Sequence, residues 1–452
     1  MKKEVLNYIL LVSIHIVLGL VIYANTFFSK IYSLLILLLG FYFIIKTKNK
    51  NNEVLLAAAY VVGSEVFLRM TDGNPLHEFS KYSVIIFMLM GMVYSGFSKN
   101  AVPYWIFLLL LVPGIIIGAT SLGINANVRK AIAFNISGSL CLGIAALYTF
   151  KRKITIQEVN NLLLVMGLPI ISCATYLFLF TPKIKDVLTG TGSNGALSGG
   201  FGPNQVATVL GLGMFIFFTR VIFNSKEKIL FILNLFLALY ISYRGMLTFS
   251  RGGMITGFLM IIIYVFIIYI NSKNTSKIKL NYIIGFVSAM MILIWSYTSY
   301  KTDGYIDKRY ANQDASGRTK ADRFTGRGEI ANEELDMFLD NPFLGVGVAM
   351  GTQIRTEKRG MTDNFASHNE LTRLLAEHGS LGIIALIILF FTPLFLYYDN
   401  KENIFLLCFL SFWLLTINHA AMRTASPSFI YALALLKIKF TNEEETIDIH
   451  RK

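Results

Sequence analysis

The chain has 452 residues, of which 54% are hydrophobic and only 15% are charged, and its formal net charge is +14. Soluble proteins of ordinary composition carry about 25% charged residues, so the composition excludes that class and indicates an integral membrane protein. The positive charge does not indicate nucleic-acid binding. The basic residues occur in short clusters between apolar runs, as they do at the flanks of membrane helices.

Apolar runs long enough to cross a membrane follow one another along most of the chain. A bilayer core about 30 Å thick requires roughly 20 apolar residues in a helix. The second and last runs are short, so we expect 12 to 14 spans. The first lacks a small-residue cleavage site and is interpreted as a retained helix. The candidate spans are residues 6–24, 31–45, 54–70, 82–98, 103–120, 131–150, 161–180, 204–222, 229–246, 252–270, 281–300, 380–398, 403–420 and 427–438.

The basic residues predict which loops face the cytoplasm. With both ends of the chain inside, the inside segments carry 20 Lys and Arg residues and the short outside loops carry 10. Because cytoplasmic loops are enriched in Lys and Arg, this difference predicts that the N-terminus and C-terminus are cytoplasmic. Residues 301–379 then form one large extracytoplasmic loop.

Arginine and lysine divide differently between the two sides of the membrane. Of 15 arginines only three are expected inside, whereas 17 of the 26 lysines are. Arginine presents a planar fork of donors that matches phosphate, and lysine is a strongly hydrated point charge. The bias therefore predicts an anionic, phosphate-bearing ligand on the outer face. The outer arginines are Arg69, Arg129, Arg244, Arg251, Arg309, Arg318, Arg323, Arg327, Arg355, Arg359, Arg373 and Arg423.

The large loop contains several local signals. Residues 301–325 are charged and rich in turn residues, and a helix is expected over 328–340 because Asn341-Pro342 disfavours its continuation. A glycine-rich turn follows at 345–347. Residues 351–363 then form a stretch that we expect to be mobile.

A second helix is expected to begin near the end of the loop, where Ser367 and Glu370 have capping-box spacing. This places His368 in the first helical turn, beside unpaired backbone N–H groups and the positive end of the helix dipole. The dipole would lower the pKa of the imidazole and favour its neutral form, which can act as a base. Three leucines would turn an apolar face of this helix toward the membrane, namely Leu371, Leu374 and Leu375.

Three motifs resemble the O-antigen ligase and polymerase family of bacterial polysaccharide assembly. The third is the most specific, because its parts recur in order over about 50 residues, and the resemblance covers roughly residues 200–440. The motifs are Gly202-Pro203-Asn204-Gln205-Val206-Ala207, then Ser250-Arg251-Gly252-Gly253, and finally Thr325-Gly326-Arg327 leading through Asn341-Pro342 and Gly345-Val346-Gly347 to Ser367-His368-Asn369-Glu370.

The resemblance implies a metal-independent glycosyltransferase built on transmembrane helices, of the GT-C-like type, without a cofactor. Such proteins take a glycan from a polyprenyl (undecaprenyl) diphosphate carrier on the outer face of the bacterial inner membrane. They transfer it to lipid A–core (ligase), to another carrier-linked glycan (polymerase), or in some relatives to a protein hydroxyl. By this resemblance Arg251 and Arg327 hold the diphosphate, and His368 activates the acceptor hydroxyl or assists the leaving group.

The residue chemistry agrees with this expectation independently. A departing diphosphate needs preorganised cations, an acceptor hydroxyl needs a base, and the outer loops contain no metal-binding motif. Further diphosphate-binding candidates are Arg244, Arg373, Arg423 and Asn204, although Asn204 could instead cap a helix and Arg423 could be an ordinary loop cation.

Two polar residues fall inside expected spans. Glu65 precedes Arg69 by four residues, a spacing that allows an ion pair on one helix face. Buried ionisable groups in membranes are often functional, yet a structural clamp explains Glu65 equally well. His15 has no evident partner and is interpreted as structural.

A transporter or flippase is the main alternative, since 12 to 14 helices would suit one. Transporters commonly show two similar halves, whereas only the second half of this chain has a long loop. A structural scaffold is a third reading, in which Arg251, Arg327 and His368 would tolerate alanine. We divide the chain into an N-terminal helix bundle (1–200), core helices (201–300), the large loop (301–379), and C-terminal helices with a tail (380–452).

Overall fold

The computed structural model describes residues 3–123, 127–181, 183–223, 227–320, 327–359, 367–418 and 423–439. Within these ranges the chain is almost entirely helical. The elements are α1 (Lys3–Ala24), α2 (Phe27–Thr47), α3 (Glu53–Met70), α4 (Phe79–Ser95), α5 (Val102–Ser121), α6 (Val128–Thr149), β1 (Lys153–Thr155), α7 (Ile156–Phe180), η1 (Lys185–Val187), η2 (Ala196–Ser198), α8 (Pro203–Phe223), α9 (Lys228–Leu247), α10 (Arg251–Asn271), α11 (Asn274–Lys301), α12 (Tyr305–Tyr310), α13 (Arg327–Asp340), α14 (Met350–Arg359), α15 (Glu370–His378), α16 (Ser380–Asp399), α17 (Leu406–Thr416), α18 (Ser426–Ala434) and β2 (Lys437–Lys439).

The protein is an all-α polytopic membrane protein, as its composition predicts. Each of the fourteen expected spans coincides with a helix, and ten helices in the described part of the chain are long and apolar enough to cross a membrane. The others are α3, which carries three charged residues in its 18, α4 with 17 residues, α17 with 11 and α18 with nine. The second run is not short, because it extends to the 21 residues of α2.

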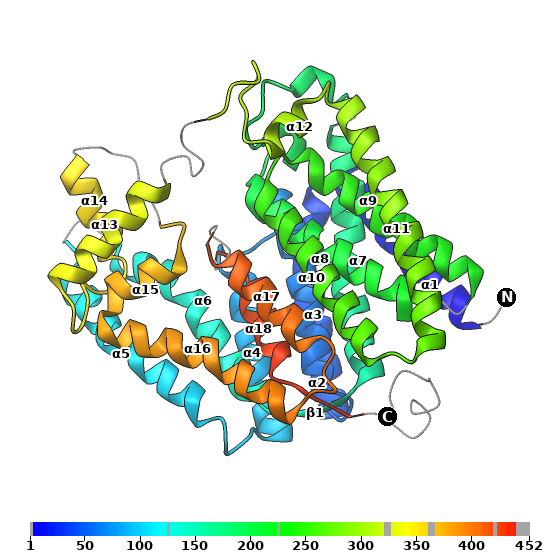
Figure 1. Ribbon diagram of the computed structural model, residues 1–452. Coiled ribbons are helices and arrows are strands. Elements are labelled where there is room, and N and C mark those ends of the chain that lie inside the picture. Colours follow the sequence, from blue (N-terminus) through cyan, green and yellow to red (C-terminus); the bar gives the residue numbers. More distant parts are fainter. Residues whose placement is uncertain are drawn as a thin grey trace.

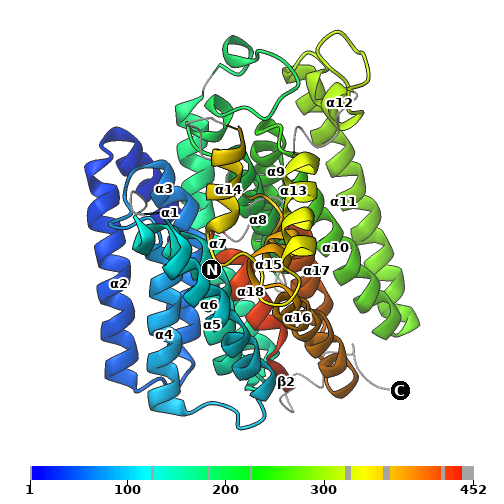
Figure 2. The same cartoon turned by 90° about the vertical axis from the view of Figure 1, so that its left-hand side faces the viewer.

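The long helices run roughly parallel, so that the two ends of the bundle are distinct. α12, α13 and α14 lie toward the upper end in Figures 1 and 2, and the short strands lie toward the lower end. β1 pairs with β2 in parallel. This pairing brings residues 153 and 437 to the same end of the bundle, and the cytoplasmic location expected for both stays a prediction.

The hydrophobic core is divided into two clusters. The larger joins α1 to α4 with α7 to α10 and α17 to α18, and the smaller joins α5, α6, α15 and α16 around Trp413 and Tyr431. In Figure 1 the α5–α16 layer lies at the left of the main bundle, with α13 to α15 above it. α15 packs on α5 and α16, and α13 and α14 pack on α15.

Close packing between α8 and α10 depends on glycines. A β-carbon at Gly257 would lie 2.3 Å from the carbonyl oxygen of Gly211, and one at Gly253 would lie 2.3 Å from the carbonyl carbon of Ala207. Gly253 and Gly257 have the four-residue spacing of a small-xxx-small motif, which lets two membrane helices approach backbone to backbone. This contact fixes the outer start of α10 beside the outer start of α8.

α17 and α18 are short helices that pack side by side, with the start of α17 close to the end of α18, and residues 417, 418 and 423–425 flank the break between them. Backbone groups at such a break require partners, because the hydrocarbon region offers no water. Glu65 accepts a hydrogen bond from the amide of Ala425 (2.7 Å), and Arg69 donates to the carbonyl of Arg423 (2.8 Å). Glu65 and Arg69 also form the expected ion pair at 2.8 Å, and Glu65 is 1% exposed. The pair is therefore buried and structural, and it holds the residues that precede α18.

The structure of the large loop confirms some of the helices and turns expected from the sequence. α13 ends at Asp340 as predicted from Asn341-Pro342. The stretch expected to be mobile is in part a helix, because α14 covers 350–359; residues 360–363 of that stretch lie outside the described residues. α15 begins at Glu370 and its cap is Asn369, whose side chain accepts a hydrogen bond from the amide of Leu371.

The α15 cap corrects the sequence interpretation of His368. The predicted capping box is wrong, since Ser367 accepts a bond from the amide of Asn369 (3.3 Å) and does not cap the helix. His368 therefore precedes the cap, outside the first turn, and the helix-dipole argument for its pKa no longer applies. The predicted apolar face is buried at Leu374 and only partly covered at Leu371 and Leu375.

The glycine-rich turn at 345–347 joins the loop to the membrane helices. Both of its glycines have positive φ, 71° and 95°, which favours glycine. The amide of Val346 donates to the carbonyl of Ala376 at the end of α15, and the amide of Val348 donates to the carbonyl of Gly114 in α5, both at 2.8 Å. The turn thus fixes α15 against α5.

We expect Gly257→Val to lower the thermal stability of the detergent-purified protein by the equivalent of about 1–3 kcal/mol, the typical cost of overpacking. The reason is that the added side chain would separate α10 from α8. Gly285→Val, in α11, is the matched control, because a β-carbon there meets no atom within 4 Å. Equal melting temperatures for the two variants would contradict the proposed role of the glycine contact.

We expect a membrane-impermeant maleimide to label Ser316→Cys in intact cells but to label Asn51→Cys only after lysis. Both positions are exposed and lie on opposite sides in the predicted topology, and the three native cysteines are buried. The reverse labelling pattern would show that the predicted topology is inverted.

Candidate functional site

Polar residues from three segments meet at the N-terminal ends of α8 and α10, which are expected on the outer side. We call Asn204, Ser250, Arg251, Arg309 and Asn312 the Arg251 cluster. The hydroxyl of Ser250 donates to the side-chain oxygen of Asn204 (2.8 Å), and Arg251 donates to the side-chain oxygen of Asn312 (3.4 Å). Two motifs that are 46 residues apart in sequence are thereby brought into direct contact.

Arg309, in α12, binds the segment that precedes Arg251 and a second loop beside it. Its Nε donates to the carbonyl of Phe249 (2.8 Å), a residue with a positive φ of 56°, and its Nη2 donates to the hydroxyl of Ser193 (3.1 Å). Burial raises the pKa of neighbouring Tyr310 to about 12, although Arg251 and Arg309 oppose the rise. Tyr310 is therefore neutral, although two guanidinium groups act on it.

Arg251 is well placed to meet an anion. It is half-buried, and it is the first residue of α10, so that the amide groups of the first helical turn lie beside it. A helix start combines unpaired N–H donors with the positive end of the dipole and favours phosphate groups. The weak 3.4 Å bond to Asn312 leaves donor capacity on the guanidinium for a ligand.

The turn that carries His368 is held by segments from another part of the chain. Arg423 donates to the carbonyl of Ser367 (3.4 Å), and the amide of Glu370 donates to the carbonyl of Ile417 at the end of α17 (2.9 Å). The Glu65–Arg69 clamp binds the backbone of this same Arg423. The position of His368 thus depends on Ile417 and Arg423, which lie between α17 and α18, as well as on α15.

A buried network of charged residues lies below this turn. Arg373 in α15 pairs with Glu370 and with Glu377 (2.8 Å), and Arg355 in α14 pairs with Glu334 in α13 (3.1 Å). All five side chains are about 90% buried or more. Three carboxylates therefore share two guanidinium groups.

Two of these carboxyl groups have raised pKa values. Burial raises the pKa of Glu377 to about 7, and the neighbouring Glu370 and Glu334 add to the rise against the attraction of Arg373. Burial also raises the pKa of Glu334, although Thr372 donates a hydrogen bond to it at 2.6 Å. The network thus holds a proton readily near neutral pH.

The predicted diphosphate ligands separate into distinct environments. Asn204 and Arg251 lie together in the Arg251 cluster, and Arg423 supports the His368 turn. Arg373 is engaged by two carboxylates, which favours a structural role for it. Arg244 is buried in α9, where it donates to the carbonyl of Leu177 (2.6 Å) and lines a separate cavity.

Arg327 is the first residue of α13, and its side chain lies outside the described part of the structure. Among the described residues, no group of three or more His, Cys, Asp and Glu side chains is arranged to hold a metal ion.

Sequence reasoning missed several residues of this region. Asn312 and Tyr310 carry no motif, and only the folding of α12 onto α10 brings them to Arg251. The Glu370–Arg373–Glu377 group could have been found, since its spacings of three and four residues place charges on one helix face.

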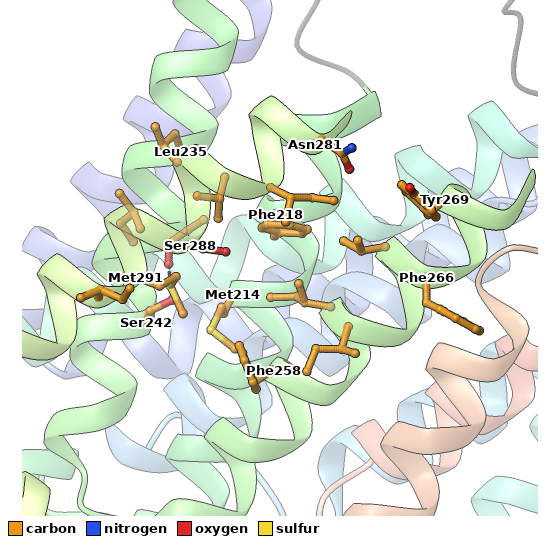
Figure 3. Close-up of a pocket in the computed structure, with 18 residues that line it drawn as sticks. Met214, Phe218, Leu235, Ser242, Phe258, Phe266, Tyr269, Asn281, Ser288 and Met291 are labelled. Carbon is orange, nitrogen blue, oxygen red and sulfur yellow. Dashed lines mark hydrogen bonds between the residues drawn. The ribbon is translucent and has the colours of Figure 1, made fainter. Parts of the chain in front are cut away.

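An apolar groove lies in the membrane-spanning part of the molecule near α10 (Figure 3). Its volume is about 580 Å³, and it is lined by α8, α9, α10 and α11. Phe258, Phe266 and Met291 are among its apolar side chains, while Ser242 and Ser288 are two of its few polar groups. Because Phe258 follows Arg251 by seven residues of helix, the groove begins about 10 Å below the Arg251 cluster.

Comparison with known families agrees with the motifs. Residues 235–387 match the family model described as O-antigen ligase. This match supports the O-antigen ligase and polymerase family. It covers α10, the large loop and the His368 turn, and therefore includes Arg251, Arg327 and His368 but not Asn204 or Arg423. No curated protein matches the chain.

We expect the stability of the protein to depend on pH through Glu377. Its raised pKa contributes stability that is fully present below the ordinary value of 4.5 and is lost as the pH rises through about 7. Glu377→Gln keeps the shape and removes this titration. The melting temperature of the wild type relative to that of the variant should fall from about pH 5 to about pH 8.

The exposed Glu357 on α14 provides the control for this measurement, as Glu357→Gln. A wild type and a Glu377→Gln variant whose melting temperatures change in parallel with pH would show that Glu377 does not carry the effect.

Proposed function

We propose that this protein transfers a glycan from a polyprenyl diphosphate carrier to an acceptor on the outer face of the bacterial inner membrane. The observation that carries the proposal is the Arg251 cluster at the start of α10, with the apolar groove along the same helix. A lipid-linked diphosphate needs both a cationic site at the membrane surface and apolar surface for its chain. The family match over residues 235–387 supports the same class of reaction.

In the proposed reaction, the acceptor hydroxyl oxygen attacks the anomeric carbon of the donor glycan, and the bond from that carbon to the diphosphate oxygen breaks. The hydroxyl proton passes to the imidazole of His368. The diphosphate departs with the bonding electron pair, and Arg251 together with Arg327 stabilises the growing negative charge. Preorganised cations of this kind lower the barrier because they need no reorganisation as the charge develops.

The local structure supports these roles. Arg251 combines a guanidinium with the amide groups of a helix start, and its neighbours Asn204 and Asn312 offer polar side chains for the first sugar or the phosphates. His368 stands in a turn held by Arg423 and Ile417 from elsewhere in the fold. A base fixed in this way loses little entropy when the acceptor binds.

We expect Arg251→Ala, Arg327→Ala and His368→Ala each to reduce glycan transfer by about 100-fold or more, the usual effect of removing charge stabilisation or a general base. Expression and membrane insertion should be unchanged. The test is a gel of surface polysaccharide from a deletion strain that carries each variant. Arg318→Ala is the matched control, because this loop arginine is 81% exposed. Normal surface glycan from Arg251→Ala or His368→Ala would contradict the mechanism.

The same gel separates the two acceptor classes. For a ligase, which we favour slightly from the family label, the deletion strain loses long chains on the lipid core and accumulates carrier-linked polymer. For a polymerase, a single repeat unit remains on the core. Donor chemistry is common to both, so the motifs around Arg251 and His368 serve either acceptor.

A further inference from the structure

A second cavity lies at the outer ends of α7, α9 and α11, apart from the Arg251 cluster. Its volume is about 610 Å³, and it is lined by these helix ends and by residues 183–186 that follow α7. We call it the Arg244 pocket. Arg251, Asn204 and Asn312 do not line it.

Arg244 is the feature of this pocket that requires an explanation. It is 1% exposed, although it lies in a membrane-spanning helix, where an unpaired charge is costly. Its Nη2 donates to the carbonyl of Leu177 (2.6 Å), while its buried Nε has no hydrogen-bond partner among the described residues. No carboxylate in the described ranges pairs with it. An anion would supply the partner that this buried guanidinium lacks among the described residues.

The remaining charges of the pocket have the same sign as Arg244. Lys183, Lys185 and Lys301 also line it, against one carboxylate, Asp186. Lys185 is engaged by Asp303 outside the lining at 2.6 Å. These four cations face only two carboxylates, Asp186 and Asp303, and the local excess of positive charge would attract an anion.

Aromatic residues place the pocket at the membrane surface. Tyr240, Tyr243 and Tyr297 line it, and the rings of Tyr243 and Tyr297 are 5.3 Å apart. Tyr297 is 48% exposed on α11, a helix of which only 11% is buried inside the protein. Tyrosine collects where the headgroups meet the hydrocarbon, so the pocket opens toward the lipid at headgroup level.

We propose that the Arg244 pocket binds the phosphate ester group of a membrane lipid in the outer leaflet, at a site separate from the donor diphosphate site. The guanidinium of Arg244 matches phosphate oxygens geometrically, and the lysines at the rim add charge without requiring a fixed geometry. The ligand is either an anionic phospholipid of the bilayer or a polyprenyl diphosphate, since the two share this chemistry.

The test is native mass spectrometry of the detergent-purified full-length chain with three probes. These are phosphatidylglycerol, diacylglycerol, which has a similar body but no phosphate, and farnesyl diphosphate as a short polyprenyl diphosphate. We expect the wild type to retain phosphatidylglycerol at least tenfold better than diacylglycerol. Arg244→Gln and Lys301→Gln should each abolish most of that difference. Lys301→Gln keeps the proposal testable if the buried Arg244 variant does not fold.

Two controls separate this site from the donor site. Lys279→Gln, at the opposite end of α11, and Arg251→Gln should leave phosphatidylglycerol retention unchanged. Loss of phosphatidylglycerol retention in Arg251→Gln would overturn the separate site. Equal retention of both phosphatidylglycerol and farnesyl diphosphate by the wild type, Arg244→Gln and Lys301→Gln would overturn the proposal. Dependence of farnesyl diphosphate alone on Arg244 would support the site and identify the carrier as its ligand. Glycan transfer is not the readout, so the outcome is independent of the proposed function.

Discussion

The ion pair between Glu65 and Arg69 is the interaction on which the outer side of the bundle depends. α17 has 11 residues and α18 has nine, so each is shorter than a helix that crosses a membrane. The ion pair binds backbone groups of residues 423 and 425, which precede α18. Breaking one partner of such a buried pair costs about 3–5 kcal/mol, because the remaining charge is left uncompensated. The segment that leads into α18 is thus held in place at residues 423 and 425.

The same contacts also help to hold the turn that carries His368. Arg423, whose backbone is held by Arg69, reaches the carbonyl of Ser367, and the end of α17 binds the amide of Glu370. On the other side, the turn at 345–347 joins α15 to α5. The His368 turn is therefore fixed between the two hydrophobic cores, although it belongs to a loop. The proposed function requires this arrangement, since a base in a freely moving loop would seldom meet both substrates.

The outer arginines, which look like a single group in the sequence, have three different roles in the structure. Arg69, Arg355 and Arg373 balance buried carboxylates. Arg309 and Arg423 bind backbone carbonyls and hold segments in place. Arg251 and Arg244 keep donor capacity beside a helix start and a cavity respectively. Of the arginines named here, only Arg251 and Arg244 are thus placed to bind the proposed phosphate groups, and the other five hold parts of the fold together.

The sequence by itself determined the membrane helices, the end of α13 and the Glu65–Arg69 pair. These features follow from local properties, namely apolar runs, a proline and residues four apart on one helix face. Only the tertiary structure decided that Asn369 caps α15, that α14 is a helix, and that Asn312 meets Arg251. The same holds for the separation of Arg244 from Arg251 into different sites. The physical reason is that hydropathy is a property of each segment, whereas the partner of a polar group depends on which distant segment packs against it.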